Sequence, residues 1–254
     1  MRDPTQRFSD RVEHYVRHRP GYPTAILDAL AARTALGRGD ACVADLGAGT
    51  GLFTARLLPL ARRVHAVEPN AAMRAAAEAQ LHGHPAFASV AGTAEATTLP
   101  DHSVDLVVAA QAFHWFEPAA FRRECTRILR PGGHLALVWN ERETDTTPFL
   151  LAYEAALRSH ATDYARVRDR HPDPTQVAAF FAPAPMDVVE TPSEQAFDLA
   201  GFIGRALSSS YAPNESHPGH ASFRRELERV FHAHAQAGQV RFRYRTRLYL
   251  GRIA

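Results

Sequence analysis

The sequence of 254 residues contains no lysine, so all 29 of its basic side chains are arginines. This absence excludes any mechanism that needs a lysine, such as formation of a Schiff base. Only two cysteines occur, Cys42 and Cys125, and their spacing matches neither a zinc motif nor a disulfide framework. We therefore expect two reduced structural thiols, as is usual in a cytoplasmic protein.

Long apolar runs and a large net charge are also missing. No run of roughly 18 apolar residues occurs, and the first ten residues, MRDPTQRFSD, have no apolar core of a signal peptide. The net charge is only +2, which does not favour a nucleic-acid or membrane partner. With 46% hydrophobic and 22% charged residues, the composition is that of a globular protein, which we expect to be cytoplasmic.

Residues 41–140 alternate apolar segments with helical ones. The apolar runs are nearly continuous, as in strands of a parallel sheet that is covered by helices on both faces. The sequence RPGG (130–133) separates the last helix from the last strand. The predicted strands are 41–46, 63–68, 87–92, 105–111 and 134–140, and the predicted helices are 52–58, 71–81 and 118–129.

The flanking segments complete a single predicted domain, 1–254. Residues 1–40 supply an N-terminal segment and a helix from Pro23, and residues 141–237 a helical cap with one strand near 186–198. In RFRYRTRLYL (241–250), within the final segment 238–254, arginines alternate with less polar residues, which predicts a half-buried strand. We predict an α/β, Rossmann-like, doubly wound sheet of seven strands, mostly parallel with an antiparallel last strand.

A glycine-rich turn follows the first predicted strand, in VADLGAGTG (43–51). Glycines permit positive φ and a close approach of a ligand to the backbone. Glu68 ends the next strand, 21 residues after Gly47, where a carboxylate can accept hydrogen bonds from ribose hydroxyls. A dinucleotide fingerprint would carry its third glycine one residue later. Asp45, just before the turn, disfavours a phosphate and suits an ammonium group, so the pattern favours S-adenosylmethionine over NAD.

With these motifs the chain resembles the class I S-adenosylmethionine-dependent methyltransferases, in the small-molecule branch of trans-aconitate methyltransferase and methyltransferase type 11 proteins. The resemblance implies methyl transfer from S-adenosylmethionine to a small organic acceptor, with S-adenosylhomocysteine as the product. The motifs occur in the family's order: VADLGAGTG (43–51), VHAVEPNAAM (64–73), GTAEAT (92–97), DLVVAAQAFHWF (105–116) and ILRPGGHLALVWN (128–140).

The same resemblance implies which residues bind the cofactor. They fall into an N-terminal lid, the glycine-rich turn, the end of the second strand, and a group around the adenine and methionine parts. The lid residues are Tyr15 and Arg19; the turn residues are Asp45, Gly47, Ala48, Gly49 and Gly51; the others are Glu68, Pro69, Met73, Thr93, Ala94, Glu95, Gln111 and Phe113.

The acceptor site is expected beside the aromatic stretch that follows the fourth strand. A carboxylate acceptor would be oriented by Arg142 or Arg205 and would need no base. A hydroxyl, phenol or amine acceptor would need a general base, and His114 is the predicted one. The candidate substrate-binding residues are Tyr22, Trp115, Trp139, Asn140, Arg142, Arg205 and Tyr211.

Other functions are considered as alternatives. A nucleic-acid methyltransferase would set the arginine stripe 241, 243, 245 and 247 against phosphates, but we expect this stripe to be the solvated face of a strand. No DPPY or NPPY motif follows the fourth strand, which argues against transfer to exocyclic amines. A cofactor-binding protein without transfer activity is the other alternative. We expect no metal, and either a monomer or a homodimer.

Overall fold

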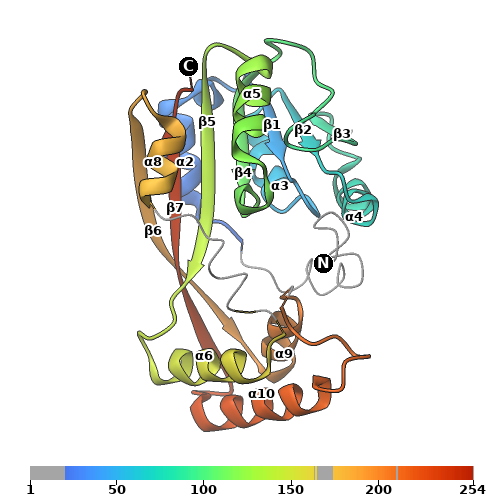
Figure 1. Ribbon diagram of the computed structural model, residues 1–254, viewed down its shortest axis with the longest axis vertical. Helices are drawn as coiled ribbons and strands as arrows, with labels where there is room; N and C mark the ends of the chain where they lie inside the picture. The colour runs from blue at the N-terminus through green and yellow to red at the C-terminus, as the bar shows by residue number, and fades with distance from the viewer. Residues whose placement is uncertain (1–20, 163, 165–173, 210, 254) are drawn as a thin grey trace.

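The computed structural model describes residues 21–162, 164, 174–209 and 211–253, so the predicted lid residues Tyr15 and Arg19 lie outside the described residues. Figure 1 shows a twisted sheet with helices on both faces and a separate group of helices beyond one end of the sheet. None of the helices in the described ranges is both long and apolar enough to cross a membrane.

The elements follow one another in the alternation that the sequence predicts for residues 41–140. The helices are α2 (Thr24–Arg33), η3 (Ala35–Arg38), α3 (Thr54–Leu57), η4 (Leu58–Leu60), α4 (Ala71–Leu81), η5 (Phe113–Trp115), α5 (Pro118–Ile128), α6 (Pro148–His160), α8 (Pro174–Phe181), α9 (Leu199–Leu207) and α10 (His220–His234). The strands are β1 (Cys42–Leu46), β2 (Arg63–Val67), β3 (Phe87–Val90), β4 (Val104–Ala110), β5 (Leu129–Arg142), β6 (Met186–Phe197) and β7 (Val240–Gly251).

One seven-stranded sheet runs through the molecule in the order β3-β2-β1-β4-β5-β7-β6. The pairs from β3 to β5 are all parallel, whereas β7 lies antiparallel to both of its neighbours, β5 and β6. The predicted fold class, including the antiparallel last strand, is confirmed. The carboxyl ends of β1, β2 and β4 therefore meet at one edge, where ligands bind in open α/β sheets.

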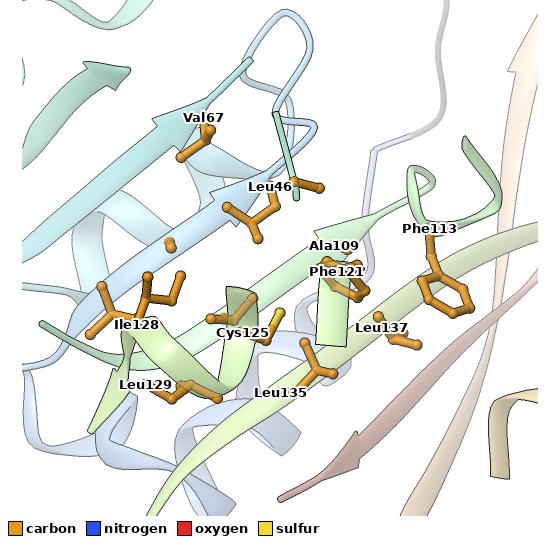
Figure 2. Packing of buried hydrophobic residues seen from close by; sticks show 14 of the residues in the cluster. Leu46, Val67, Ala109, Phe113, Phe121, Cys125, Ile128, Leu129, Leu135 and Leu137 are labelled. Carbon is orange, nitrogen blue, oxygen red and sulfur yellow. The ribbon is translucent and has the colours of Figure 1, made fainter. Parts of the chain in front are cut away.

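Two apolar clusters fill the space between the sheet and its helices. On one face, α5 packs Phe121, Cys125 and Ile128 against β1, β4 and β5, as Figure 2 shows. On the other face, α2 contributes Ile26 and Leu30 to a second buried cluster with β1 and β4. Both faces of the central strands are thus buried, which explains their continuous apolar sequences.

Two predicted boundaries within this core are wrong. The helix expected at 52–58 is only the short α3 followed by η4, because Pro59 cannot donate the backbone hydrogen bond that would continue an α-helix. The RPGG segment does not separate α5 from a strand at 134–140. It lies inside β5, between Leu129, which pairs with Val104, and His134, which pairs with Leu106. The extra residues form an irregularity in the β4–β5 register, and Gly132 has φ of 80° there.

The alternation in β7 separates a buried face from an exposed one. Phe242, Tyr244, Thr246, Leu248 and Leu250 are all at most 3% exposed. The four arginines between positions 240 and 248 instead form ion pairs with glutamates of β5, β6 and the segment after β5. These pairs are Arg241–Glu194, Arg243–Glu194, Arg245–Glu143, Arg245–Glu190, Arg247–Glu141 and Arg247–Glu190.

The helices α6, α9 and α10 form a cap beyond the carboxyl end of β5 (Figure 1). A third apolar cluster joins this cap to the first half of β7, through residues such as Tyr153 of α6, Phe202 of α9 and Phe242 of β7. The aromatic rings of Tyr153 and Phe242 meet edge to face, with their centroids 5.0 Å apart. The cap and the sheet therefore share one long strand.

A buried carboxylate fixes the segment between β3 and β4. Oε1 of Glu124 on α5 accepts hydrogen bonds from the Thr97 backbone N–H (2.7 Å) and from the Thr97 hydroxyl (2.5 Å). Arg127 forms an ion pair with the same carboxylate at 2.7 Å. Although burial alone would raise it, the hydrogen bonds from Arg127 and Thr97 lower the pKa of Glu124 to about 2.

We predict that Glu124→Ala lowers the free energy of unfolding by about 2 kcal/mol at pH 7, because it leaves the buried donors of Thr97 without an acceptor. The depressed pKa means that this stabilisation is present above pH 4.5 and is lost as the pH falls through about 2. Urea denaturation of both proteins at several pH values measures the difference. Glu228→Ala, which removes the exposed pair with Arg224, serves as the control and should cost less than about 1 kcal/mol. An equal loss in both variants would contradict the prediction.

Candidate active site

A cavity lies beyond the carboxyl ends of β1, β2 and β4. Its empty volume is about 830 Å³, including open space at its mouth. Its walls combine glycines, one buried carboxylate, apolar side chains and two aromatic rings, which is a typical composition for a small-molecule site. The lining residues are Gly47, Gly49, Glu68, Pro69, Asn70, Met73, Thr93, Ala94, Glu95, Ala110, Gln111, Ala112, Trp115 and Phe116.

The turn after β1 needs glycine for backbone conformation and for space. Gly47 has φ of 69°, and a Cβ atom there would lie 2.7 Å from the Cβ of Ala112 and 3.2 Å from the ring of Phe116. Gly51, with φ of 83°, would place a Cβ 2.6 Å from Leu81 of α4. Gly47 therefore keeps the cavity open, whereas Gly51 lets α4 pack against the turn and does not line the cavity.

Glu68, directly after β2, holds the two turns of the site together. Its Oε2 accepts a hydrogen bond from the Gly49 N–H, and its Oε1 accepts one from the Asn70 N–H, each at 2.8 Å. Burial raises the pKa of this carboxyl, and the two backbone hydrogen bonds and Arg74 oppose the rise. An ionised carboxylate has about four acceptor positions, so two backbone donors leave room for two hydroxyl groups of a ligand.

Asp45 is the second buried carboxylate of this edge, with only 1% of its surface exposed. Its Oδ2 accepts a hydrogen bond from the Thr54 hydroxyl at 2.6 Å, while its Oδ1 has no hydrogen-bond partner among the described residues. Burial raises the pKa of Asp45 to about 6; the Thr54 hydrogen bond opposes the rise, and the charge of Glu68 adds to it. An unpartnered buried carboxylate oxygen fits the ammonium group of an amino-acid ligand.

Short segments after β3 and β4 form the remaining walls. Gln111 has φ of 57°, a region rarely used by residues other than glycine, and its amide donates a hydrogen bond to the Asn140 carbonyl at 2.8 Å. Glu95 accepts a hydrogen bond from the Glu117 N–H at the start of α5. These contacts fix the cavity wall to β5 and to α5.

The aromatic stretch after β4 forms the short helix η5, which sends its side chains in different directions. Trp115 and Phe116 line the cavity. Phe113, predicted to contact the cofactor, instead packs in the core, with its ring 5.9 Å from that of Trp139. His114 lies beside Trp115, with ring centroids 4.7 Å apart, but it is not one of the lining residues.

The predictions for β5 need correction. Trp139 does not face the cavity but lies in the core cluster, 3% exposed. The side-chain amide of Asn140 donates a hydrogen bond to the Gly21 carbonyl, and its oxygen accepts one from the Thr246 hydroxyl. The guanidinium of Arg142 forms an ion pair with Glu154 of α6 at 2.7 Å, so it already has a counter-charge. The side chains at the end of β5 therefore join the sheet to the cap.

The remaining predicted substrate residues lie in two other places. Tyr22 packs against Phe53, with ring centroids 4.6 Å apart, beside the cluster around α2. Arg205 is buried in the cap, and Tyr211 contacts Tyr164 there. Neither group lines the cavity.

Four lining residues were missed by sequence reasoning: Asn70, Ala110, Ala112 and Phe116. The signal for Asn70 was present, since an asparagine directly before a helical segment is a typical N-cap. Its side chain accepts a hydrogen bond from the Met73 N–H and so fixes the first turn of α4. The two alanines had no signal, because their role is to leave space.

Comparison with known proteins shows similarity to methyltransferases. Residues 44–137 match the family described as Methyltransferase domain. An uncharacterized methyltransferase of Mycobacterium tuberculosis is 44% identical over 145 residues, which are 56% of this chain and 55% of the relative. A malonyl-[acyl-carrier protein] O-methyltransferase of Methylococcus capsulatus is 40% identical over 105 residues, 40% of this chain and 38% of the relative. The chain spans about half the length of the first of these relatives.

The fold similarity extends further along the chain. A solved structure described as a type II methyltransferase candidate from Anaeromyxobacter dehalogenans superimposes with a TM-score of 0.66. The similarity covers 92% of this chain and 97% of that one at 24% sequence identity, so it shows the fold alone. The matched family implies S-adenosylmethionine as the cofactor, and the turn, Asp45 and Glu68 fit its parts.

We predict that Gly47→Ala weakens the binding of S-adenosylmethionine at least tenfold, or about 1.4 kcal/mol, because the methyl group enters the cavity. Gly39→Ala is a matched control, since Gly39 has φ of 74° but a Cβ added there would meet no atom within 4 Å. Both variants carry the same backbone strain, of roughly 1–2 kcal/mol. Calorimetric titration should show weaker binding only for Gly47→Ala. Equal affinities in the two variants would show that the cavity at Gly47 is not the cofactor site.

The raised pKa of Asp45 predicts a pH dependence of cofactor binding. Below about pH 6 the carboxyl is protonated and cannot pair with the ammonium group. The affinity for S-adenosylmethionine should therefore rise as the pH increases from 5 to 7 and should then level off. Titrations at fixed ionic strength measure this profile, and Asp45→Asn should bind more weakly and remove the dependence. A flat wild-type profile would contradict the role of Asp45.

Proposed function

We propose that this chain, whose residues 44–137 form a methyltransferase domain of the class I S-adenosylmethionine-dependent type, transfers a methyl group to a small organic acceptor. The observation that carries the proposal is the cavity in which the glycine turn, Glu68 and the aromatic wall of Trp115 and Phe116 meet. The cofactor, when bound, supplies a methyl group that is activated by its positively charged sulfur.

Each cofactor-binding role follows from a group in or beside the cavity. Glu68 accepts hydrogen bonds from the ribose hydroxyls, and Asp45 pairs with the ammonium group. Met73 and Ala94 supply apolar walls for the adenine ring, since both line the cavity and are at most 4% exposed. Gln111 orients the methionine part from the end of β4. Both ends of the cofactor are therefore bound by residues at the carboxyl ends of the strands β1, β2 and β4.

The protein contributes mainly position and exclusion of water. The acceptor's lone pair forms the new bond as the carbon–sulfur bond breaks, so the reacting atoms must lie in line. Holding two reactants in such an arrangement lowers the barrier by up to about 7–11 kcal/mol in favourable intramolecular cases. The rings of Trp115 and Phe116 cover the cavity wall with apolar surface, which favours this arrangement.

A small-molecule acceptor is favoured over a nucleic acid. The arginine stripe of β7, which would have to contact phosphates, is already paired with glutamates of β5, β6 and the segment after β5. A salt-dependent nucleic-acid interface needs free basic side chains. The relative from Methylococcus capsulatus acts, by its name, as an O-methyltransferase, and we propose transfer to oxygen for this chain as well.

The test is transfer of a labelled methyl group. The protein is incubated with methyl-labelled S-adenosylmethionine and a panel of carboxylic acids, phenols, alcohols, amines and RNA. Label in a small-molecule product supports the proposal, and its release as methanol in mild alkali identifies a methyl ester. Binding of the cofactor without transfer to any member of the panel would contradict the proposal, and so would label found only in RNA.

His114→Ala separates two kinds of acceptor. For an acceptor that must lose a proton, we predict that kcat falls by about 100-fold or more while the affinity for the cofactor is retained. For a carboxylate acceptor, which has no proton to lose, kcat should stay nearly unchanged. His160→Ala, at the end of α6 and outside the cavity, is the control. A loss of cofactor binding in His114→Ala would show that the residue is structural.

A further inference from the structure

A second group of polar side chains lies in the cap, at the end of the long strands β5 and β7. Arg142 of β5 is directly opposite Tyr244 of β7 in the sheet register. Arg205 of α9 reaches the same place and donates a hydrogen bond to the Tyr244 hydroxyl at 3.3 Å. The charges of both arginines act on Tyr153, in a mainly apolar and aromatic part of the molecule.

Arg142 has its charge neutralised. Its Nη2 lies 2.7 Å from the Glu154 carboxylate and donates a further hydrogen bond to the Tyr164 hydroxyl at 3.0 Å. The guanidinium also lies over the ring of Tyr153, 4.9 Å from its centroid. A buried arginine with a carboxylate partner and an aromatic face is a complete structural unit. Nothing in these contacts calls for a ligand.

Arg205 has no such counter-charge. It is 5% exposed, and its contacts are hydrogen bonds to the Tyr244 hydroxyl and the Ser209 hydroxyl, each at 3.3 Å, and the ring of Phe242 at 5.8 Å. Among the described residues its hydrogen-bonding and charged neighbours are tyrosines and a serine, and none is a carboxylate. An arginine cannot give up its proton inside a protein, so the charge stays buried.

The neighbouring tyrosines do not supply the missing negative charge. Burial raises the pKa of Tyr153, so its hydroxyl stays neutral and offers only a dipole. Burying a charge without an opposite charge beside it is unfavourable, and an oppositely charged ligand removes that cost. The guanidinium of Arg205 therefore lacks an anion beside it among the described residues, and a bound ligand could supply one.

The place of Arg205 is connected to the cofactor cavity. Gln111, which lines the cavity, donates a hydrogen bond to the carbonyl of Asn140. Arg142 follows two residues later on β5, a distance of about 7 Å along a strand. Tyr244 lies opposite Arg142, and Arg205 contacts Tyr244. A chain of contacts through β5 and β7 therefore links the cavity wall to the guanidinium of Arg205.

We propose that Arg205 binds the carboxylate of the methyl acceptor, which is then a small organic acid placed between the cap and the cofactor cavity. The inference rests on the proposed methyl transfer and names its substrate class. Asp45 and Glu68 give the donor side a negative charge that suits a cationic cofactor, while Arg205 gives the acceptor side a positive charge. Arg205 is a better candidate than Arg142 for binding the acceptor, because Arg142 is paired with Glu154 whereas the described hydrogen-bond partners of Arg205 are neutral.

The experiment compares Arg205→Met with two other variants. Arg142→Met removes the paired arginine, and Arg224→Met removes an arginine of α10 whose side chain is 55% exposed. The labelled-methyl assay uses small carboxylic acids together with their amides, which have nearly the same shape but no charge. In parallel, thermal unfolding is followed with acetate, succinate and benzoate, against the matching amides at equal ionic strength, in the presence of S-adenosylhomocysteine.

We expect acids to accept the methyl group and their amides to do so much less well. Arg205→Met should raise KM for the acid about 10- to 100-fold, the range for a lost charge-assisted hydrogen bond, with unchanged cofactor affinity. A carboxylate should raise the unfolding temperature of the wild type and of Arg224→Met but not of Arg205→Met. Without ligand, Arg205→Met should unfold at the wild-type temperature or above, and Arg142→Met below it, because Glu154 loses a buried partner.

The proposal is overturned if amides are methylated as well as acids, or if Arg205→Met leaves KM unchanged. It is also overturned if ligand-free Arg205→Met unfolds well below the wild type, since Arg205 would then be a structural tie. Failure of the proposed function looks different, with cofactor binding but no transfer to any compound. In that case the unfolding experiment still decides whether Arg205 binds anions. A rise in unfolding temperature on adding carboxylate that occurs in the wild type but not in Arg205→Met supports the site. If carboxylate does not raise the unfolding temperature of the wild type, the site is rejected.

Discussion

The hydrogen bonds of Glu68 are the contact on which the candidate site depends. One carboxylate accepts from the Gly49 N–H and from the Asn70 N–H, and so joins the turn after β1 to the start of α4. The backbone N–H groups of Gly47 and Ala48 also bond to the carbonyl of Val67, at the end of β2. The turn at Gly47–Gly49 and the segment Glu68–Asn70 are thereby fixed relative to each other, and the glycines leave room for a ligand to approach the backbone.

The length of β5 and β7 positions the cap. Their pairing continues to Arg142 and Tyr244, beyond Val138, which is the last residue of β5 that pairs with β4. Along the chain α6 follows β5, α9 follows β6 and α10 precedes β7, and the β5–β7 register places Arg142 opposite Tyr244. The carboxylates of Asp45 and Glu68 therefore lie at the ends of the short strands, whereas the cap holds Arg205 of α9, and the charge of Arg142 is neutralised by Glu154. A cationic donor and an anionic acceptor fit this division of charge.

The sequence predicts local features well and partner choice poorly. The turn at Gly47, the carboxylate at Glu68 and the buried alternation of β7 follow from residue type and spacing over short segments. By contrast, Arg142 and Arg205 look alike in the sequence. Their difference arises because α6 brings Glu154 to Arg142, whereas Arg205 meets two hydroxyls and an aromatic ring among the residues that the structure describes. The role of Phe113 was also unpredictable, because the helix η5 decides which of its aromatic side chains turn into the core. The role of Trp139 depends instead on which face of β5 its side chain takes.

The central claim is that the Glu68 carboxylate binds the ribose hydroxyls of S-adenosylmethionine. Calorimetric titration of the cofactor into Glu68→Gln tests it most directly, since the amide keeps the shape but removes the charge and half of the accepting capacity. Glu228→Gln, on α10, is the matched control. We predict binding at least tenfold weaker in Glu68→Gln, a loss of about 1.4 kcal/mol or more, with wild-type affinity in the control. Equal affinities in the two variants, with both proteins folded, would contradict the account.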